Sequence, residues 1–235
     1  MMMLGRTGEG GSAVHCRISK RTLPAAVAAL CVSGAAPALA HPHVFAEANL
    51  EVAIDADRNV VALRHVWRFD DLFSSTVLLE FDKNADLVLD NAELEEVGAV
   101  IHESLAEFNY FQIVTAGGKE VDMVAPDRIM ANYEDNQLII LFESRPAEPL
   151  HLDGQLDFGV YDPTFYTAID FYEDKNLVVA DLPESCIRTV VRPNPDEAIA
   201  MNQQSLTEAF FNDPSNNDYS KLFATRLELN CSGEG

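Results

Sequence analysis

"FAEANLEVAID", residues 45–55, and "VVALRHVWRF", residues 60–69, decide the fold class of this chain. The first stretch alternates polar residues with apolar ones, which are Phe45, Leu50, Val52 and Ile54. The four residues that separate the two stretches, "ADRN", are typical of a turn. Alternation on both sides of a short turn predicts an antiparallel hairpin over residues 44–69.

The periodicity then changes from that of a strand to that of a helix. Apolar residues recur every three or four positions at Leu94, Val97, Ile101, Leu105 and Phe108. This spacing predicts a helix with one apolar face. The preceding stretch "DDLFSSTVLLEF" predicts a shorter helix with Asp70 or Asp71 near its N-cap.

Strand patterns resume after residue 109. "YFQIVTAGGKEVDM" contains a Gly-Gly turn, "NQLIILFES" is a continuous apolar strand, and "LHLDGQLDFGVY" alternates. "TAIDFYEDKNLVVADL" predicts a further hairpin around "EDKN", and "CIRTVV" predicts a last short strand. We therefore expect a mainly β (α+β) fold, an antiparallel sandwich-like domain with a helix-loop-helix insertion at about 70–109 and a C-terminal helix and tail at about 195–235.

Residues 1–40 predict a cleaved secretory signal peptide. The basic residues Arg17, Lys20 and Arg21 precede an apolar stretch, and "ALA" at 38–40 fits the small-x-small cleavage rule. An N-terminal membrane anchor is the alternative. The remaining residues, 41–235, are expected to form one β-rich domain in the periplasm, with no membrane span.

Charge and cysteine content narrow the partners and the compartment. The chain has 38 Asp and Glu against 16 Lys and Arg, a net charge of −22, which excludes nucleic acid and attracts cations. Cys186 and Cys231 are the two cysteines beyond residue 40. An even number in an oxidising compartment predicts a disulfide between them, and two free buried thiols are the alternative.

The stretch "DKNADLVLDNAE", residues 82–93, matches the pattern of a calcium-binding loop between two helices. The positions that supply ligands in this pattern are Asp82, Asn84, Asp86, Val88 through its carbonyl, Asp90 and Glu93. Leu87 stands where the pattern has glycine, and a β-carbon there costs roughly 1–2 kcal/mol. The loop is either a calcium site or a structural corner.

"HPHVF", residues 41–45, places two histidines at the expected mature N-terminus. Cleavage after Ala40 gives His41 a free α-amine, which can chelate a metal together with its own imidazole, while His43 offers a second imidazole. Nitrogen ligands of this kind suit nickel, cobalt, zinc or copper. Pro42 has no N–H and so excludes a chelate through the second backbone nitrogen. A frayed terminus without metal is the alternative.

Other polar residues give weaker signals. We expect His65 to be a structural histidine with satisfied hydrogen bonds and His102 to lie on the solvent side of its helix, while His151 begins a strand. Asp70, Asp162, Tyr166 and Asp170 are candidates for lining a pocket. The sequence has no G-x-S-x-G, no phosphate-binding glycine loop and no CxxC, so we expect no catalytic residues and no enzyme.

Five stretches in this order resemble the domain-of-unknown-function 1007 family: "HPHVF", "WRFDDLFS", "DKNADLVLDNAEL", "VYDPTFY" and "LPESC". The resemblance covers nearly all of 41–191. It implies a periplasmic component of an uncharacterised transport system, encoded near nickel/cobalt-type transporters. Members carry an N-terminal His-x-His and usually a glycine in the acidic loop, from which Leu87 departs.

Three functions follow from these signals. The first is a periplasmic metal-binding accessory protein that exchanges a transition-metal ion with a membrane metal transporter. Exchangeable nitrogen ligands at a mobile terminus suit such transfer better than a closed structural cage. The second is a calcium-stabilised β-sandwich interaction module without a metal-carrying role. The third is a copper enzyme that uses the N-terminal histidine clamp.

Overall fold

The computed structural model describes residues 42–202 and 219–232. The chain divides into two units, residues 1–39 and 40–235, and all the described residues lie in the second unit. The predicted signal peptide and His41 lie outside the described residues, as does much of the predicted C-terminal helix and tail. Residues 195–202 are helical, in agreement with the start of that helix.

The predicted hairpin is confirmed as strands β1 (Val44–Ile54) and β2 (Asn59–Phe69), which pair antiparallel. Asp55 organises its turn, because Oδ1 accepts hydrogen bonds from the backbone amides of Asp57 (2.9 Å) and Asn59 (2.8 Å). On the other side of β2 lies β7 (Gln137–Pro146), also antiparallel. Three short strands complete this side of the first sheet: β5 (Met123–Val124), β6 (Met130–Glu134) and β8 (Leu150–His151).

The predicted hairpin over "TAIDFYEDKNLVVADL" is wrong. Its two strands, β10 (Thr167–Asp170) and β11 (Leu177–Val179), do not pair with each other; both run parallel to β1 along its free edge. The residues between them form a 3₁₀ turn, η2 (Asp174–Asn176), that carries the chain onward instead of reversing it. Phe171 anchors this turn in the core, and Asn176 Nδ2 donates to Asn49 Oδ1 of β1 (2.7 Å). The first sheet is therefore mixed.

The second sheet is antiparallel among the described residues, in the order β12 (Cys186–Val191), β13 (Arg226–Cys231), β9 (Gly154–Val160), β3 (Gln112–Ala116) and β4 (Lys119–Glu120). Gly117 and Gly118 form the predicted turn between β3 and β4, and both have positive φ, which glycine adopts without strain. The predicted disulfide is confirmed: Cys186 and Cys231 face each other in register on β12 and β13.

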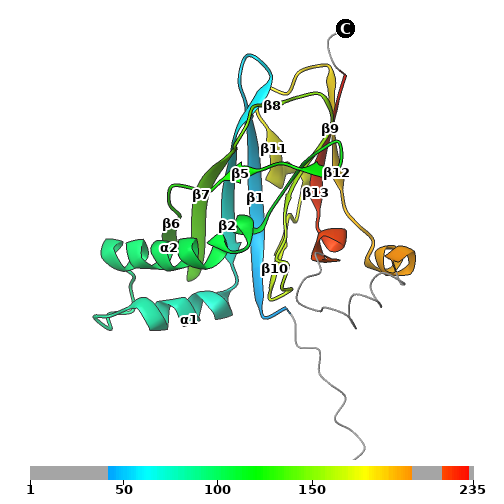
Figure 1. Cartoon of the computed structure of the whole chain (residues 1–235). Helices are drawn as coiled ribbons and strands as arrows, with labels where there is room; N and C mark the ends of the chain where they lie inside the picture. The colour runs from blue at the N-terminus through cyan, green and yellow to red at the C-terminus, as the bar shows by residue number, and fades with distance from the viewer. Residues whose placement is uncertain (1–41, 203–218, 233–235) are drawn as a thin grey trace, which may run out of the picture. The chain divides into compact units, whose positions relative to one another are not determined.

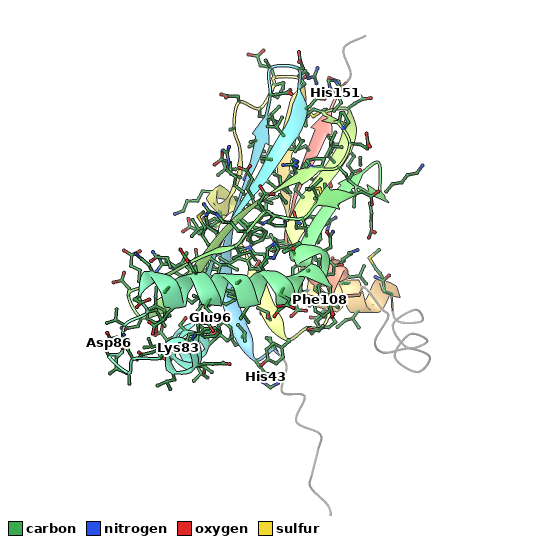
Figure 2. The ribbon with its side chains drawn as sticks, turned by 60° about the vertical axis from the view of Figure 1, so that its left-hand side comes forward. His43, Lys83, Asp86, Glu96, Phe108 and His151 are labelled. Carbon is green, nitrogen blue, oxygen red and sulfur yellow. A yellow bond between two sulfur atoms is a disulfide. The ribbon has the colours of Figure 1, made fainter. Side chains whose placement is uncertain are left out.

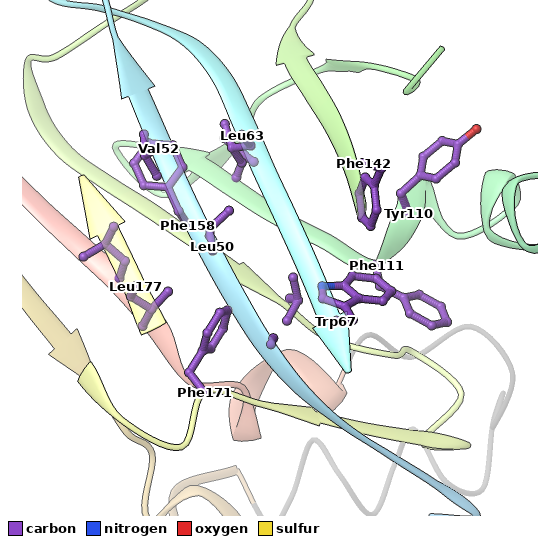
Figure 3. Packing of buried hydrophobic residues seen from close by; sticks show 14 of the residues in the cluster. Leu50, Val52, Leu63, Trp67, Tyr110, Phe111, Phe142, Phe158, Phe171 and Leu177 are labelled. Atoms are coloured by element: carbon purple, nitrogen blue, oxygen red, sulfur yellow. The ribbon is translucent and has the colours of Figure 1, made fainter. Parts of the chain in front are cut away.

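The inner faces of the two sheets enclose one hydrophobic core, which confirms the sandwich-like fold (Figures 1 and 3). Trp67 of β2 lies near its centre, with its ring stacked on Phe111 and edge-on to Phe142. The other large side chains that are fully buried are Leu50, Leu63, Leu138, Ile140, Leu152, Leu156, Phe158, Phe171, Leu177, Leu227 and Leu229.

The helical insertion is confirmed between β2 and β3 as α1 (Asp71–Phe81) and α2 (Asn91–Ala106). Helix α1 packs against β7 and helix α2 packs against β6, both in the first sheet. The turn η1 (Asn109–Phe111) then leads back to β3. No helix of the described part combines the length and hydropathy needed to span a bilayer. The C-terminal turn η3 (Tyr219–Phe223) precedes β13.

Candidate functional site

Three of the sequence motifs meet where the described chain enters β1. The backbone amides of His43 and Val44 donate to the carbonyl oxygen of Tyr166 (2.9 and 3.2 Å). The amide of Phe45 donates to Oδ2 of Asp70 (2.8 Å), whose own amide donates back to the Phe45 carbonyl (2.9 Å). "HPHVF", "WRFDDLFS" and "VYDPTFY" therefore form one structural unit at this end of the first sheet.

Asp70 connects this unit to the helices. Its Oδ1 accepts a hydrogen bond from the amide of Phe73 (2.9 Å) and so caps α1, while Oδ2 holds Phe45. One carboxylate thereby fixes the start of α1 relative to the start of β1. The prediction of an aspartate N-cap here is confirmed.

Asp162 organises the loop that carries Tyr166. The side chain is 5 % exposed; Oδ1 accepts from the amide and hydroxyl of Thr164 (2.7 and 2.6 Å), and Oδ2 accepts from the amide of Thr167 (2.8 Å). Both oxygens are thus engaged with their own loop. The sequence grouped Asp70, Asp162, Tyr166 and Asp170 as pocket candidates. In the structure Asp70 and Asp162 bind backbone amides and fix the positions of β1 and Tyr166. Oδ1 of Asp170 accepts from the hydroxyl of Thr225 (2.8 Å).

His43 is exposed, and its ring lies tilted against the ring of Tyr166 with the centroids 5.2 Å apart. In Figure 2, His43 lies at the end of the strands near α1, and His151 lies at the opposite end. The N-terminal histidine is therefore presented to solvent beside an aromatic side chain that is itself half exposed. Its predicted partner ligand, His41, lies outside the described residues.

The acidic loop between α1 and α2 is closed by its own hydrogen bonds. Glu93 is buried, and its two oxygens accept from the backbone amides of Lys83 (Oε1, 2.8 Å) and Asp90 (Oε2, 2.9 Å). Asp90 in turn accepts from the amides of Ala92 and Glu93, which completes a capping box at the start of α2. Glu93 therefore ties the first residues of the loop to the second helix.

The other side chains of the loop also bind its backbone. Asp82 accepts from the amides of Asp86 (3.2 Å) and Leu87 (2.7 Å), and Asp86 Oδ1 accepts from the amide of Val88 (2.9 Å). The amide of Asp86 donates a second hydrogen bond, to Oδ1 of Asn84 (2.8 Å). Leu87 has a φ of 65°, so the loop keeps the left-handed turn of the calcium-loop pattern although leucine has replaced glycine.

The remaining histidines differ from expectation in two cases. His65 is buried in the core, but neither ring nitrogen has a hydrogen-bond partner among the described residues, so the prediction of a satisfied histidine is wrong. Burial lowers the pKa of His65 to about 3. His102 is half buried, and its Nε2 donates to the carbonyl oxygen of Pro126 (2.7 Å) instead of facing solvent. Within residues 42–202 and 219–232, no group of three or more His, Cys, Asp or Glu is arranged to hold a metal ion.

Comparison with known proteins identifies the family. No curated protein matches the chain. Among solved structures, AChBP from Bulinus truncatus aligns with 82 % of this chain and 88 % of its own at 13 % identity, with a TM-score of 0.34, a likeness too weak to support an argument. A family model described as "Protein of unknown function (DUF1007)" matches residues 26–231, which include the five stretches that carry the resemblance. The chain therefore belongs to the DUF1007 family.

Proposed function

We propose that this protein is an exported metal-binding accessory protein whose N-terminal His-Pro-His captures a transition-metal ion for exchange with a membrane metal transporter. The observation that carries the proposal is the anchoring of His43. Its backbone is bonded to Tyr166, and the next residues are held by Asp70 through Phe45, so His43 lies on a fixed backbone and not on the mobile terminus expected from the sequence. A ligand at the edge of a rigid sheet has a defined position, which lowers the entropic cost of completing a metal site.

The chemistry of the terminus supports nickel, cobalt, zinc or copper over harder cations. Two imidazoles and an α-amine are nitrogen donors of intermediate softness, which first-row transition metals prefer to oxygen-only ligands. The net charge of −22 raises the local concentration of divalent cations around the protein. The disulfide is compatible with an exported protein.

The test is a calorimetric titration of the mature chain, beginning at His41, with Ni²⁺, Co²⁺, Zn²⁺ and Cu²⁺. We expect His41→Ala and His43→Ala each to weaken metal binding by at least about tenfold, because each variant removes one of the proposed imidazole ligands. His151→Ala is the matched control, because this exposed histidine lies at the other end of the strands (Figure 2). Unchanged binding in the double variant His41→Ala/His43→Ala would contradict the proposal.

A second variant separates the amine from the imidazoles. One alanine added before His41 moves the α-amine away from the first imidazole and leaves both histidines intact. The amine–imidazole clamp predicts weaker binding in this extended chain. Equal affinity with and without the added residue would show that the amine is not a ligand, and would count against the copper-enzyme alternative as well.

A calcium-stabilised interaction module is the second candidate. The left-handed turn at Leu87 supports it, because the loop keeps the backbone conformation that the calcium-loop pattern needs. Thermal unfolding with CaCl₂ or MgCl₂ tests this candidate. A calcium-specific rise in the midpoint that is lost in Asp82→Asn/Asp86→Asn would support a calcium site, and identical midpoints in both salts would favour a hydrogen-bonded corner.

A further inference from the structure

A groove of about 550 Å³ lies over the outer face of the first sheet, the face turned away from the core. Its floor is formed by β1, β2 and β7, and the segment from Ala125 to Met130 lines one side. The volume falls within the range of sites that bind small organic molecules, about 300–1,000 Å³. Neither the acidic loop nor His43 contributes to it.

An apolar row runs from the floor of this groove to the side that Met130 lines. Val66 of β2 lies in register with Leu141 of β7, and Leu141 lies in register with Met130 of β6. Val66 and Leu141 are half buried, and Met130 is 48 % exposed. The outward face of an antiparallel sheet in a solvated position normally carries polar residues, so three aligned apolar side chains are unusual there. They offer a contact surface for an apolar group.

A charged row lies beside the apolar one. Glu51, Arg64 and Glu143 are in register across β1, β2 and β7, and Arg64 bonds both carboxylates (2.8 Å to Glu51 and 2.9 Å to Glu143). The guanidinium of Arg64 is therefore already neutralised by its two neighbours. This row forms a polar wall and leaves other residues to bind an anion.

Two further arginines, Arg128 and Arg145, line the same groove. Neither Arg128 nor Arg145 forms an ion pair or a side-chain hydrogen bond with any residue that the structure describes. This is notable in a chain with 38 acidic and 16 basic residues, because carboxylates are abundant and most of the other described arginines are bonded. Arginine binds carboxylates through a planar pair of donors, so two unpaired guanidinium groups suit an anionic group.

The segment that carries Arg128 is fixed in place by α2. The carbonyl oxygen of Pro126 accepts the bond from His102, and the Ile129 carbonyl approaches α2 so closely that a β-carbon on Gly98 would lie 2.3 Å from its oxygen. Only glycine permits this approach. Arg128 therefore projects from a backbone held on both sides, which is the preorganisation expected of a binding site.

We propose that this groove binds a small organic acid with an apolar chain or ring. The apolar part lies on the row of Val66, Leu141 and Met130, and the carboxylate is bound by Arg128 and Arg145. An anion site of this kind is independent of the proposed metal binding at His43. A ligand without an apolar part cannot make the contact with the apolar row. A ligand without a negative charge cannot form the ion pairs with the two arginines.

Matched ligands test both halves of the proposal. We would titrate the protein with 4-phenylbutyrate, with the neutral 4-phenylbutanol and with acetate, and follow binding by NMR chemical shifts. We expect saturable binding of 4-phenylbutyrate, with the alcohol and acetate each weaker by at least about tenfold. Shifts confined to β2, β6 and β7 and to residues 125–130 are expected.

Matched variants locate the site. Arg128→Gln/Arg145→Gln is expected to weaken 4-phenylbutyrate binding at least about tenfold, and Met130→Ser to weaken it several-fold. Lys119→Gln/Lys175→Gln is the control, because it removes the same charge from exposed positions outside the groove. All the altered side chains are exposed, so unfolding midpoints close to that of the wild type are expected. Absence of saturable binding, or equal affinity in the two double variants, would overturn the proposal.

Discussion

The imidazole of His65 lies flat on the ring of Phe142, with the centroids 4.5 Å apart and the planes inclined by 10°. The two residues are directly opposite on β2 and β7, and Trp67 presents its edge to both rings. Nearby, the hydroxyl of Ser144 donates to Oε1 of Gln112, so the neighbouring polar groups bond each other. His65 is thus packed as an aromatic residue.

This packing predicts a stability that depends on pH through His65. Its pKa is about 3 in the folded protein and about 6.5 in the unfolded chain, so the unfolded state takes up the proton first as pH falls. Stability contributed by the neutral imidazole is complete above pH 6.5 and is lost between pH 6.5 and 3, by at most about 5 kcal/mol. Urea unfolding at intervals from pH 7.5 to 4 measures the slope.

The variant His65→Met separates this effect from the titration of carboxylates. Methionine fills the same region without an ionisable group, so the slope between pH 6.5 and 4 should become shallower. His151→Met, at an exposed position, should leave the slope as in the wild type. Parallel curves for His65→Met and the wild type would show that His65 does not control acid stability.

Glu93 should stabilise the helix pair without any metal. Glu93→Ala removes the acceptor of two backbone amides, those of Lys83 and Asp90, and should lower the free energy of unfolding by about 1–3 kcal/mol. Glu93→Gln keeps one carbonyl acceptor and should lose less. Glu95→Ala, exposed on the same helix, is the control. Chemical denaturation with a chelator present measures all three, and equal stabilities would mean that these bonds contribute nothing.

Leu87 should be a site where a smaller residue stabilises the fold. It is 66 % exposed with a φ of 65°, so its side chain contributes little packing and its backbone is strained by roughly 1–2 kcal/mol. Leu87→Gly relieves that strain but adds about 0.5–1 kcal/mol of conformational entropy to the unfolded chain. We expect a net gain of up to about 1 kcal/mol in the free energy of unfolding. A measurable loss of stability would contradict the assignment.

The disulfide should contribute strongly to stability. Cys186 and Cys231 are 45 positions apart, and a crosslink across a loop of this length restricts the unfolded chain by about 4 kcal/mol in the loop-entropy model. Cys186→Ala/Cys231→Ala should lose an amount of this order, measured by guanidinium unfolding. Reduction of the wild type should have a similar effect, and reductant should leave the double variant unchanged.

Helices, strands and turns that depend only on neighbouring residues in the sequence were predicted from local patterns. The β1–β2 hairpin follows from alternation around one turn, the helix pair from a period of three to four, and the capping role of Asp70 from its place before an apolar helix. The capping role of Asp90 was not predicted, because the sequence assigned this residue to the calcium-loop pattern. The pairing of Cys186 with Cys231 followed from there being two cysteines in the expected mature chain. These features need no knowledge of distant partners.

Features that depend on distant partners were missed. Alternation shows that two segments are strands but does not show whether they pair with each other. Strands β10 and β11 were predicted to pair, whereas both run beside β1. Strand β6 was not predicted, because "MANYE" is short and does not alternate regularly between apolar and polar residues. The same limit applies to the groove: Arg128 and Arg145 belong to segments that only the pairing of β5, β6 and β7 brings together. The metal site at His41 and His43 stays a prediction.

The bond between His43 and Tyr166 has a consequence for the order of events during synthesis. A chain made from its N-terminus contains residue 43 long before residue 166. The backbone of His43 therefore acquires its fixed position only when most of the domain has been made and β10 has joined β1. Nascent chains and chains truncated before residue 166 carry His43 but lack this anchor, so the anchored form of His43 is a mark of a completed fold.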